Sequence, residues 1–408
     1  MQVLRRVGQA LAQRPVLLLL FAIHPVVSIV HVIQQRGAWQ ADGLPVGWDF
    51  AIFLTGARIV ELDASRLYDF HFQSLVEHAW RAGTYHTFPF ISPPFVAILL
   101  VPLAHIPYGY ALAVWSFAGV VLASVALGWL ATPVSWRERV LLFCFFPFTF
   151  ALIAGQSTLF VFAIMAGVYH LVSRERVSLA GAACAMLTFK PQCLFGLLLF
   201  FLVHFRGRNA LRFWVSFGAA TLTLLGIGYA ASPAATQMYA HLSIDVLPRF
   251  QLDAFDRTQI HTWRSFWMLA LPSHDRLAEI VAATFALGGA AFAVWFWARR
   301  GGRLFVDYSL AVLLGLWCAP HAYLYDWTVL AIPLILVWEH FPEKRPEWLA
   351  LFGLIAFVLL GSELFAEWVR AHARVSIQPS LVLLAALPFV GWRVIRTGDR
   401  ASASDLGR

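Results

Sequence analysis

The sequence predicts an all-α fold, a polytopic transmembrane helical bundle with about twelve spans. Of its 408 residues, 60% are hydrophobic and only 13% are charged, and the mean hydropathy is +0.71. That composition excludes a water-soluble globular domain. Many apolar runs approach the length of about 20 residues that a helix needs to cross a hydrocarbon core roughly 30 Å thick. Loops between alternate runs are rich in arginine, which is typical of cytoplasmic loops.

The spans follow from the apolar runs taken in order. Residues 15–34 come after a basic stretch and resemble a signal sequence, but no small-residue cleavage site follows, so we interpret them as a retained first span. Basic clusters fall in every second loop, for example at Arg174 and Arg206, which places both termini in the cytoplasm. The predicted spans are residues 15–34, 108–130, 139–154, 157–173, 178–190, 191–205, 210–230, 277–298, 305–319, 324–340, 347–366 and 377–394.

The charge pattern also bears on location and partners. We expect a multi-pass protein of the plasma (inner) membrane whose immediate partners are membrane lipids. The net charge of +8 comes from arginines dispersed over separate short loops. Dispersed charge of this kind is a topology signal and argues against nucleic acid as a partner.

One apolar segment, residues 93–106, does not fit as a span because it is short and bounded by prolines. Counting it would invert every later loop against the charge rule. We interpret it as a re-entrant or interfacial helix.

Two segments on the predicted outer side are long, residues 35–92 and 231–276. The first is expected to form amphipathic helices along the outer leaflet, one of them over residues 50–62. Its apolar face would hold Phe50, Phe53, Leu54, Ala57 and Val60, and its other face Thr55 with Arg58 and Glu61, which would form a surface ion pair.

The chain is predicted to form one membrane domain over residues 1–396, followed by a disordered cytoplasmic tail at 397–408. The four cysteines lie inside apolar runs with no CxxC pair, so they are expected to be packing residues. His71 and His78 share a helix face, but no third ligand lies near them, so no metal site is expected.

Polar side chains interrupt the apolar pattern in three outer turns and in the two long outer segments. Ionisable groups at such places mark functional sites by default, because an isolated charge in a membrane is costly. We expect these side chains to converge in one outward-facing cavity. The candidates are Gln156, Lys190, His321 and Asp326 in the turns, Asp49, Arg58 and Tyr68 in the first segment, and Arg264 in the second.

Each central candidate also has a structural interpretation. Lys190 could extend to lipid headgroups as an interfacial lysine does, and Asp326 could pair with an arginine in the bundle. His321 could be an interior histidine with satisfied hydrogen bonds, and Gln156 could join neighbouring helix ends. Asp49 follows a tryptophan at the start of a helix, so spacing alone favours an N-cap carboxylate.

A set of short motifs resembles glycosyltransferase family 87, over roughly residues 47 to 335. These motifs are Trp48-Asp49-Phe50, Ala57-Arg58, Leu67-Tyr68-Asp69, Ser92-Pro93-Pro94-Phe95 with Pro102-Leu103-Ala104 and Pro107, Gly155-Gln156-Ser157, Ala180-Gly181 leading to Phe189-Lys190-Pro191-Gln192, and Pro320-His321 to Asp326-Trp327. The chain departs from the family pattern in Phe90-Ile91-Ser92, where a tyrosine often precedes the double proline, and in Ser157, where asparagine often stands.

The resemblance implies a type C glycosyltransferase fold and a polyprenol-phosphate-dependent transferase, with mannose as the default sugar. It implies that Asp49 is the general base in a single inverting displacement onto an acceptor hydroxyl of a glycan or glycolipid at the outer (periplasmic) face. The donor is a polyprenyl-monophosphate sugar, and Lys190, Arg264 and His321 would hold its phosphate. No metal or other cofactor is required, since the leaving phosphate needs electrostatic stabilisation and not a proton donor.

Two other classes of protein are also considered as interpretations of the sequence. A transporter or flippase for a lipid or small molecule of the cell envelope would favour inverted repeats and charges near the membrane midplane, neither of which is apparent in the sequence. A noncatalytic scaffold subunit of an envelope assembly would also be consistent with the high aromatic content, 15% of the residues.

Overall fold

A computed structural model describes residues 46–80, 89–132, 136–247 and 256–390. Over these ranges the chain forms helices joined by turns, and no strand occurs. The predicted span at 15–34 and the predicted tail at 397–408 lie outside the described residues. The all-helical class predicted from composition is therefore confirmed for the part that the structure covers.

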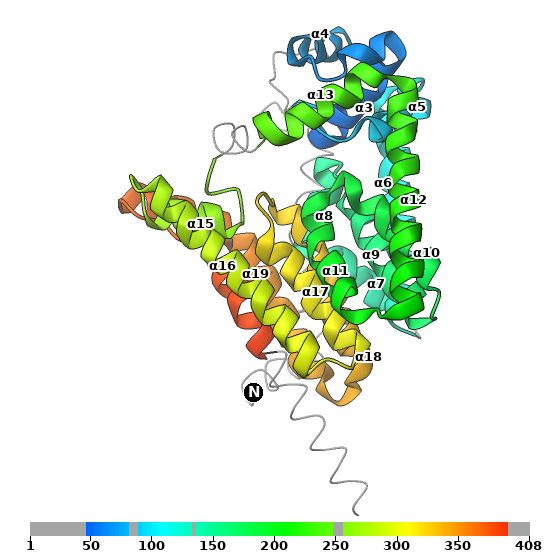
Figure 1. Ribbon diagram of the computed structural model, residues 1–408. Helices are drawn as coiled ribbons and strands as arrows, with labels where there is room; N and C mark the ends of the chain where they lie inside the picture. Colours follow the sequence, from blue (N-terminus) through cyan, green and yellow to red (C-terminus); the bar gives the residue numbers. More distant parts are fainter. Residues whose placement is uncertain (1–45, 81–88, 133–135, 248–255, 391–408) are drawn as a thin grey trace, which may run out of the picture.

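The first half of the chain builds a small layer and then a helical bundle (Figure 1). The layer contains α3, α4 and, from later in the chain, α13; α5 and α12 lie beside it, and α6 and α12 lead down into the bundle. The elements are α3 (Trp48–Asp63), η1 (Ala64–Arg66), α4 (Phe70–Trp80), α5 (Pro94–Ala104), α6 (Tyr108–Leu130), α7 (Trp136–Cys144), α8 (Phe146–Ala154), α9 (Thr158–Ser173), α10 (Val177–Ala185), η2 (Met186–Phe189), α11 (Pro191–His204) and α12 (Gly207–Ala231).

The second half of the chain adds α13 to the small layer and places a second group of helices against α8, α9 and α11. α17 packs along α11, and η4 packs on α8 and α9. The elements are α13 (Pro233–His241), η3 (Leu242–Val246), α15 (Trp263–Ala270), α16 (Asp275–Arg299), α17 (Leu304–Cys318), η4 (Leu324–Leu330), α18 (Ala331–His340), η5 (Pro342–Lys344), α19 (Arg345–His372) and a last apolar helix, Pro379–Val390.

Four helices of the described chain are long and apolar enough to cross a membrane: α6, α12, α16 and the helix over Pro342–His372. Other predicted spans correspond to shorter apolar helices, such as Thr158–Ser173 and Leu304–Cys318. The apolar helices mark a membrane-embedded protein. The lipid-facing character is plainest on α12, whose exposed side chains include Leu211, Val215 and Leu222.

Three of the predicted spans are not continuous α-helices, and one of them, residues 178–190, forms α10 and then the 3₁₀ helix η2. Residues 139–154 divide at Phe145 into α7 and α8, because a continuous helix would need an N–H on Pro147, a residue that is tolerated only in the first turn of α8. Residues 324–340 begin as the 3₁₀ helix η4 and continue as the α-helix α18. Hydropathy alone gave no sign of the change from 3₁₀ to α geometry.

The segment 93–106 forms α5, a helix of 11 residues. It packs mainly on α3 and also against α12, and Phe95 and Ala97 on it are buried. Its length is about half of what a span needs, which agrees with the interpretation that it does not cross the membrane as an ordinary span.

The amphipathic prediction for residues 50–62 is only partly right. Phe50, Phe53, Leu54 and Ala57 are buried as expected, but Thr55 on the predicted polar face is buried too. The cause is that α3 packs against α5 on one side and touches α4 and α8 on others. Helix α3 is therefore a core element of its layer. The Glu61 carboxylate lies 2.9 Å from Nε2 of His105, and its charge also acts on Arg58, the partner predicted for it.

Candidate active site

Two glycines allow the start of α3 to touch the end of α8. Gly47 precedes α3 with a φ of 74°, and Gly155 ends α8 with a φ of 68°, both in the left-handed region that glycine adopts without strain. The Gly47 amide donates to the Ile153 carbonyl over 2.8 Å. A Cβ atom on Gly155 would lie only 2.6 Å from Cβ of Phe50. Side chains at this junction are thus held at fixed positions by close backbone contact.

Aromatic side chains secure the same junction. Tyr108 donates its hydroxyl to the carbonyls of Val46 and Gly47, over 2.6 and 2.8 Å. The Trp115 indole donates to the Gly155 carbonyl over 2.9 Å. These bonds satisfy the carbonyl groups of both turns, so the glycine-linked junction is rigid on the side of α6.

Asp49 lies in the first turn of α3 at this junction and is 6% exposed. Gln156, directly after the Gly155 turn, donates its side-chain amide to Oδ2 of Asp49 over 3.2 Å. The other end of that amide, Oε1, accepts from the Ser157 backbone N–H at 2.8 Å, which fixes its orientation. The N-cap interpretation of Asp49 is wrong, because Gly47 is the N-cap residue and no side chain caps this helix.

Lys190 and Asp326 form an ion pair beside this carboxylate. Lys190 is the N-cap residue of α11, where Pro191 occupies the first helical position. Asp326 lies in the first turn of η4, and its second oxygen accepts from the Tyr323 backbone N–H at 3.0 Å. The side chains of Lys190 and Asp326 are 11% and 3% exposed. The arginine that we considered as a partner of Asp326 is therefore a lysine.

Tyr325 connects the ion pair with Asp49. The Lys190 ammonium lies 5.4 Å from the centre of the Tyr325 ring, a distance typical of a cation–π contact. The Tyr325 hydroxyl interacts with the Asp49 carboxylate, and its ring packs against Phe150 on α8. Tyr325 was not predicted as a site residue. The one sequence feature that could have indicated it is its position next to Asp326 in a polar turn.

Burial raises the pKa of Asp49 to about 7, from an ordinary value of 3.8. Desolvation is the largest cause, because a charged carboxylate loses its water in this position. The hydrogen bonds from Gln156 and Tyr325 and the charge of Lys190 act in the opposite direction, whereas Asp326 raises the pKa further. Near neutral pH the Asp49 carboxyl can therefore both take up and release a proton.

His321 stands at the edge of this group. Its ring packs edge-on against Tyr323, with 5.3 Å between ring centres, and the charges of Asp326 and Lys190 act on it. Burial lowers the pKa of His321 to about 4. At pH 7 the imidazole is neutral, so it would meet an anion as a hydrogen-bond donor and not as a cation.

The remaining candidates make their contacts elsewhere. Arg264 on α15 pairs with Glu279 of α16 over 2.6 Å. Tyr68 donates its hydroxyl to the Ser92 carbonyl over 2.6 Å and packs on Phe90 within the layer. Arg58 follows Asp49 by nine residues of the same helix, about 13 Å along its axis and on the opposite face. Among the described residues, no group of three potential metal ligands occurs.

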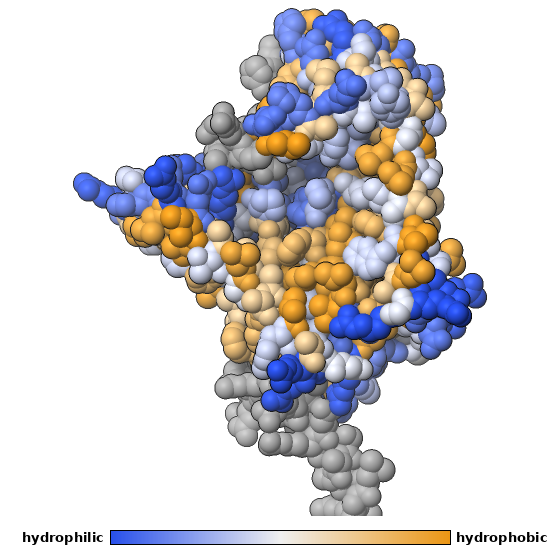
Figure 2. Space-filling model, in the orientation of Figure 1, coloured by the Kyte–Doolittle hydropathy of each residue, from blue (hydrophilic) through white to orange (hydrophobic). Residues whose placement is uncertain are grey.

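The molecule is hollowed between the layer and the bundle. Figure 2 shows this recess between α3 and α13 above and the helices below, with hydrophilic and intermediate side chains gathered around it, while apolar side chains cover the bundle beneath. The start of α3, the end of α8 and the start of η4 meet between these two parts. We call one group of five side chains the polar junction: Asp49, Gln156, Lys190, Tyr325 and Asp326.

The fold and this junction define a membrane-embedded helical protein with a buried, titratable carboxylate beside a lysine–aspartate pair. The model of glycosyltransferase family 87 matches residues 90–320, more than half of the chain. The chain belongs to this family and is a membrane glycosyltransferase. A search of curated proteins and a search of solved structures each find no match.

The matched range is narrower than the resemblance noted in the sequence. It contains Gln156, Lys190 and Arg264 and excludes Asp49 and Asp326, which lie before and after it. Both aspartates are tied to the matched part by direct contacts, Asp49 to Gln156 and Asp326 to Lys190.

Proposed function

We propose that this glycosyltransferase moves a hexose, mannose by default, from a polyprenyl-monophosphate donor to an acceptor hydroxyl of a glycan or glycolipid. The transfer is a single inverting displacement at the outer face of the plasma membrane, and Asp49 is the general base. The observation that carries the proposal is the burial of Asp49 in the polar junction, which raises the pKa of its carboxyl to about 7.

The position of Asp49 suits a general base. A base works best when its pKa lies near the ambient pH, because a substantial fraction is then unprotonated and that form is still basic. In the proposed step the acceptor hydroxyl gives its proton to Asp49 while its oxygen attacks the anomeric carbon of the donor. The bond from that carbon to the phosphate oxygen breaks, and the polyprenyl phosphate leaves with the electron pair. Asp326 is less suited to this role, since Lys190 already holds its charge.

The leaving phosphate needs positive charge and hydrogen-bond donors. Lys190 has three N–H donors, of which one meets Asp326, so the others are available to a phosphate oxygen. His321 would contribute a neutral N–H, and Arg264 would contribute a cation if the chain brings α15 to the donor. Stabilisation of this kind requires no proton donor, metal or other cofactor.

The donor assay tests the proposal as a whole. Purified protein would be incubated with polyprenyl-monophosphate hexoses and, separately, with nucleotide-linked hexoses, together with a panel of glycan and glycolipid acceptors. Mass spectrometry is expected to detect a glycosylated product with the lipid-linked donors only, and far less of it for Asp49→Asn. Transfer from nucleotide sugars, or equal turnover by Asp49→Asn, would overturn the proposal.

A labelling experiment tests the proposed side of the membrane. Ser65 lies in the predicted outer segment, Ser173 is the last residue of the predicted span 157–173 at its predicted inner end, and both are exposed. Each would be changed to cysteine in a variant whose four native cysteines are replaced. A membrane-impermeant thiol reagent is expected to label Ser65→Cys in intact cells and Ser173→Cys only after lysis. The reverse pattern would refute the outer location.

A further inference from the structure

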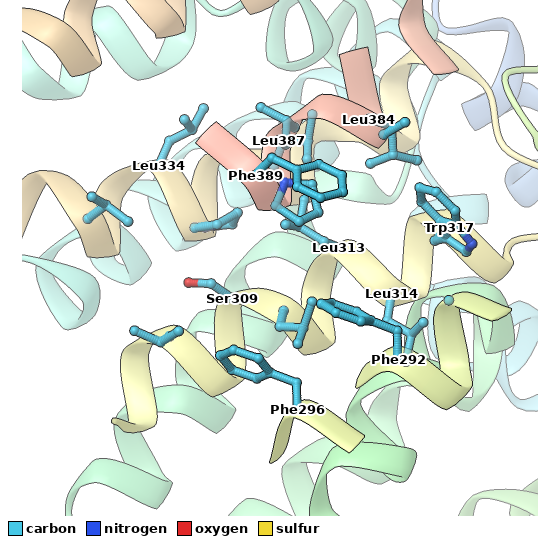
Figure 3. A pocket seen from close by; sticks show the side chains of 18 of the residues that line it. Phe292, Phe296, Ser309, Leu313, Leu314, Trp317, Leu334, Leu384, Leu387 and Phe389 are labelled. Carbon is cyan, nitrogen blue, oxygen red and sulfur yellow. The ribbon is translucent and has the colours of Figure 1, made fainter. Parts of the chain in front are cut away.

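A second site lies away from the polar junction, between α16, α17, α18, α19 and the last helix (Figure 3). It is a cavity of about 680 Å³, within the range of pockets that hold small organic ligands. Its walls are almost entirely hydrocarbon and aromatic surface. Phe292 and Phe296 come from α16, Leu313 and Trp317 from α17, and Phe389 from the last helix.

Most polar groups in the cavity wall already have partners, but the Trp348 indole N–H is buried there without one among the described residues. Ser309 donates its hydroxyl to the Phe305 carbonyl at 2.6 Å, and the Trp317 indole donates to the Phe285 carbonyl at 2.7 Å. Arg300 is the one ionised residue among the lining residues that the structure describes. Beyond the Trp348 indole and Arg300 the wall offers a polar ligand no compensation for its lost water, so the cavity favours a ligand that is mostly apolar.

The cavity is elongated along α17. Its lining residues on that helix run from Val306 to Trp317, which is about 16 Å along the axis, or roughly half the thickness of a hydrocarbon core. Gly289 on α16 creates room for the Trp317 ring, since a Cβ there would lie 2.4 Å from its indole nitrogen. Phe292 and Phe389 at the cavity are 47% and 73% exposed, so its apolar wall continues onto the outside of the molecule.

One continuous stretch of chain joins this cavity to the polar junction. Asp326 pairs with Lys190 at the start of η4, and Leu330 at the end of η4 lines the cavity. The two residues are separated by about 8 Å of 3₁₀ helix. Pro333, Leu334 and Val337 of α18 continue the same wall. One end of the apolar cavity therefore begins about one helical turn beyond the ion pair.

We infer that this cavity binds the hydrocarbon chain of the lipid-linked donor while the donor phosphate lies at the polar junction. The inference rests on the proposed function. A prenyl chain matches the apolar lining, the elongated form and the exposed apolar edge, and its phosphate end would lie beside Lys190. A phospholipid would instead place its phosphate at Arg300, at the other end of the cavity, and it is the competing occupant.

Filling the cavity tests the inference. Leu313→Trp adds a large side chain to the middle of the wall, and Leu222→Trp, on the exposed face of α12, is the matched control. For a long-chain donor, Leu313→Trp is expected to raise KM about tenfold or more with little change in kcat, because overpacking of an apolar site costs on this order. For a donor with a short chain, KM should stay near the wild-type value. Equal KM changes for both donors, or none, would overturn the inference.

A binding measurement covers the case in which Leu313→Trp fails to fold. A photoreactive amino acid in place of Leu334 would be irradiated with a polyprenyl monophosphate or with phospholipid, and the adduct identified by mass spectrometry. Attachment of the prenyl lipid, competed by unlabelled donor, supports the inference. Attachment of phospholipid alone, or of the chain's own apolar segment at residues 15–32, refutes it. If prenyl lipid binds here but no sugar is transferred, the proposed function fails while the binding site stands.

Discussion

Asp49 and Asp326 are two buried aspartates in the same junction, and their surroundings differ. Asp326 pairs directly with Lys190 and accepts a backbone hydrogen bond from Tyr323. Among the described residues, Asp49 accepts from two neutral donors, the Gln156 amide and the Tyr325 hydroxyl, and the charge of Lys190 acts on it from farther away. Burial among neutral groups favours the protonated form of a carboxyl, and it raises the pKa of Asp49.

This difference assigns the two side chains to different tasks. Under the proposed function, the raised pKa of Asp49 suits it to accept a proton near neutral pH. Asp326 positions Lys190, which in turn lies against the Tyr325 ring. In an active site, two titratable groups with different surroundings can take different roles, one as the base and the other as an electrostatic partner.

The largest expected effect comes from Asp49→Asn. Asparagine keeps the shape and can still bond Gln156, but it cannot accept the acceptor's proton. We expect kcat to fall about 10²–10⁴-fold, the usual contribution of a general base, with donor binding retained. Steady-state kinetics and donor titration of the purified variant measure both quantities. Loss of donor binding with normal kcat would assign Asp49 to binding instead.

Lys190→Ala should affect stability as well as donor use. It leaves Asp326 buried without its cation, which costs about 3–5 kcal/mol. The double variant Lys190→Ala with Asp326→Ala removes both charges and should recover part of that loss. Unfolding midpoints in denaturing detergent report the stability, and KM for donor against acceptor reports the function. If the double variant is less stable than Lys190→Ala, the pair is not the stabilising unit described.

Tyr325→Phe is expected to change the pH dependence and little else. The Tyr325 hydroxyl lowers the pKa of Asp49, so its removal should raise that pKa. Because the base must be unprotonated, wild-type kcat/KM should rise with pH through about 7, and in Tyr325→Phe this rise should move to higher pH. A shift to lower pH, or none, would show that the hydroxyl does not act on Asp49.

Tyr68→Phe gives the smallest effect and serves as the contrasting control. It removes one hydrogen bond, to the Ser92 carbonyl, inside the layer that holds α3. The expected cost is about 1 kcal/mol of stability, with kcat and its pH dependence unchanged. A kcat loss near that of Asp49→Asn would mean that the layer itself carries catalytic groups.

Some of this arrangement could be predicted from the sequence, and the reasons are physical. The charges of the loops and the lengths of the apolar runs indicated that four side chains lie on the same side of the membrane: Asp49, Gln156, Lys190 and Asp326. The structure brings these four together. Neither the charges of the loops nor the lengths of the apolar runs indicate how one helix packs on another. The pairing of Lys190 with Asp326 therefore escaped prediction.

Other features escaped because they depend on tertiary contacts that have no periodic signal. Helix α3 has a weakly amphipathic sequence, yet packing on several sides buries even Thr55. The neutral state of His321 results from burial at a turn whose exposure could not be read from the chain. In the sequence nothing distinguishes Tyr325 from the other aromatic residues. Its contacts with Lys190 and Asp49 in the structure place it in the polar junction.

Titration of Asp49 by infrared spectroscopy tests the central claim most directly. The difference between wild type and Asp49→Asn isolates the carboxyl bands of this one side chain, recorded in detergent from pH 5 to pH 9. The account predicts a protonated carboxyl at pH 5 that ionises with a midpoint near 7. A carboxylate that is already ionised at pH 5 would contradict it.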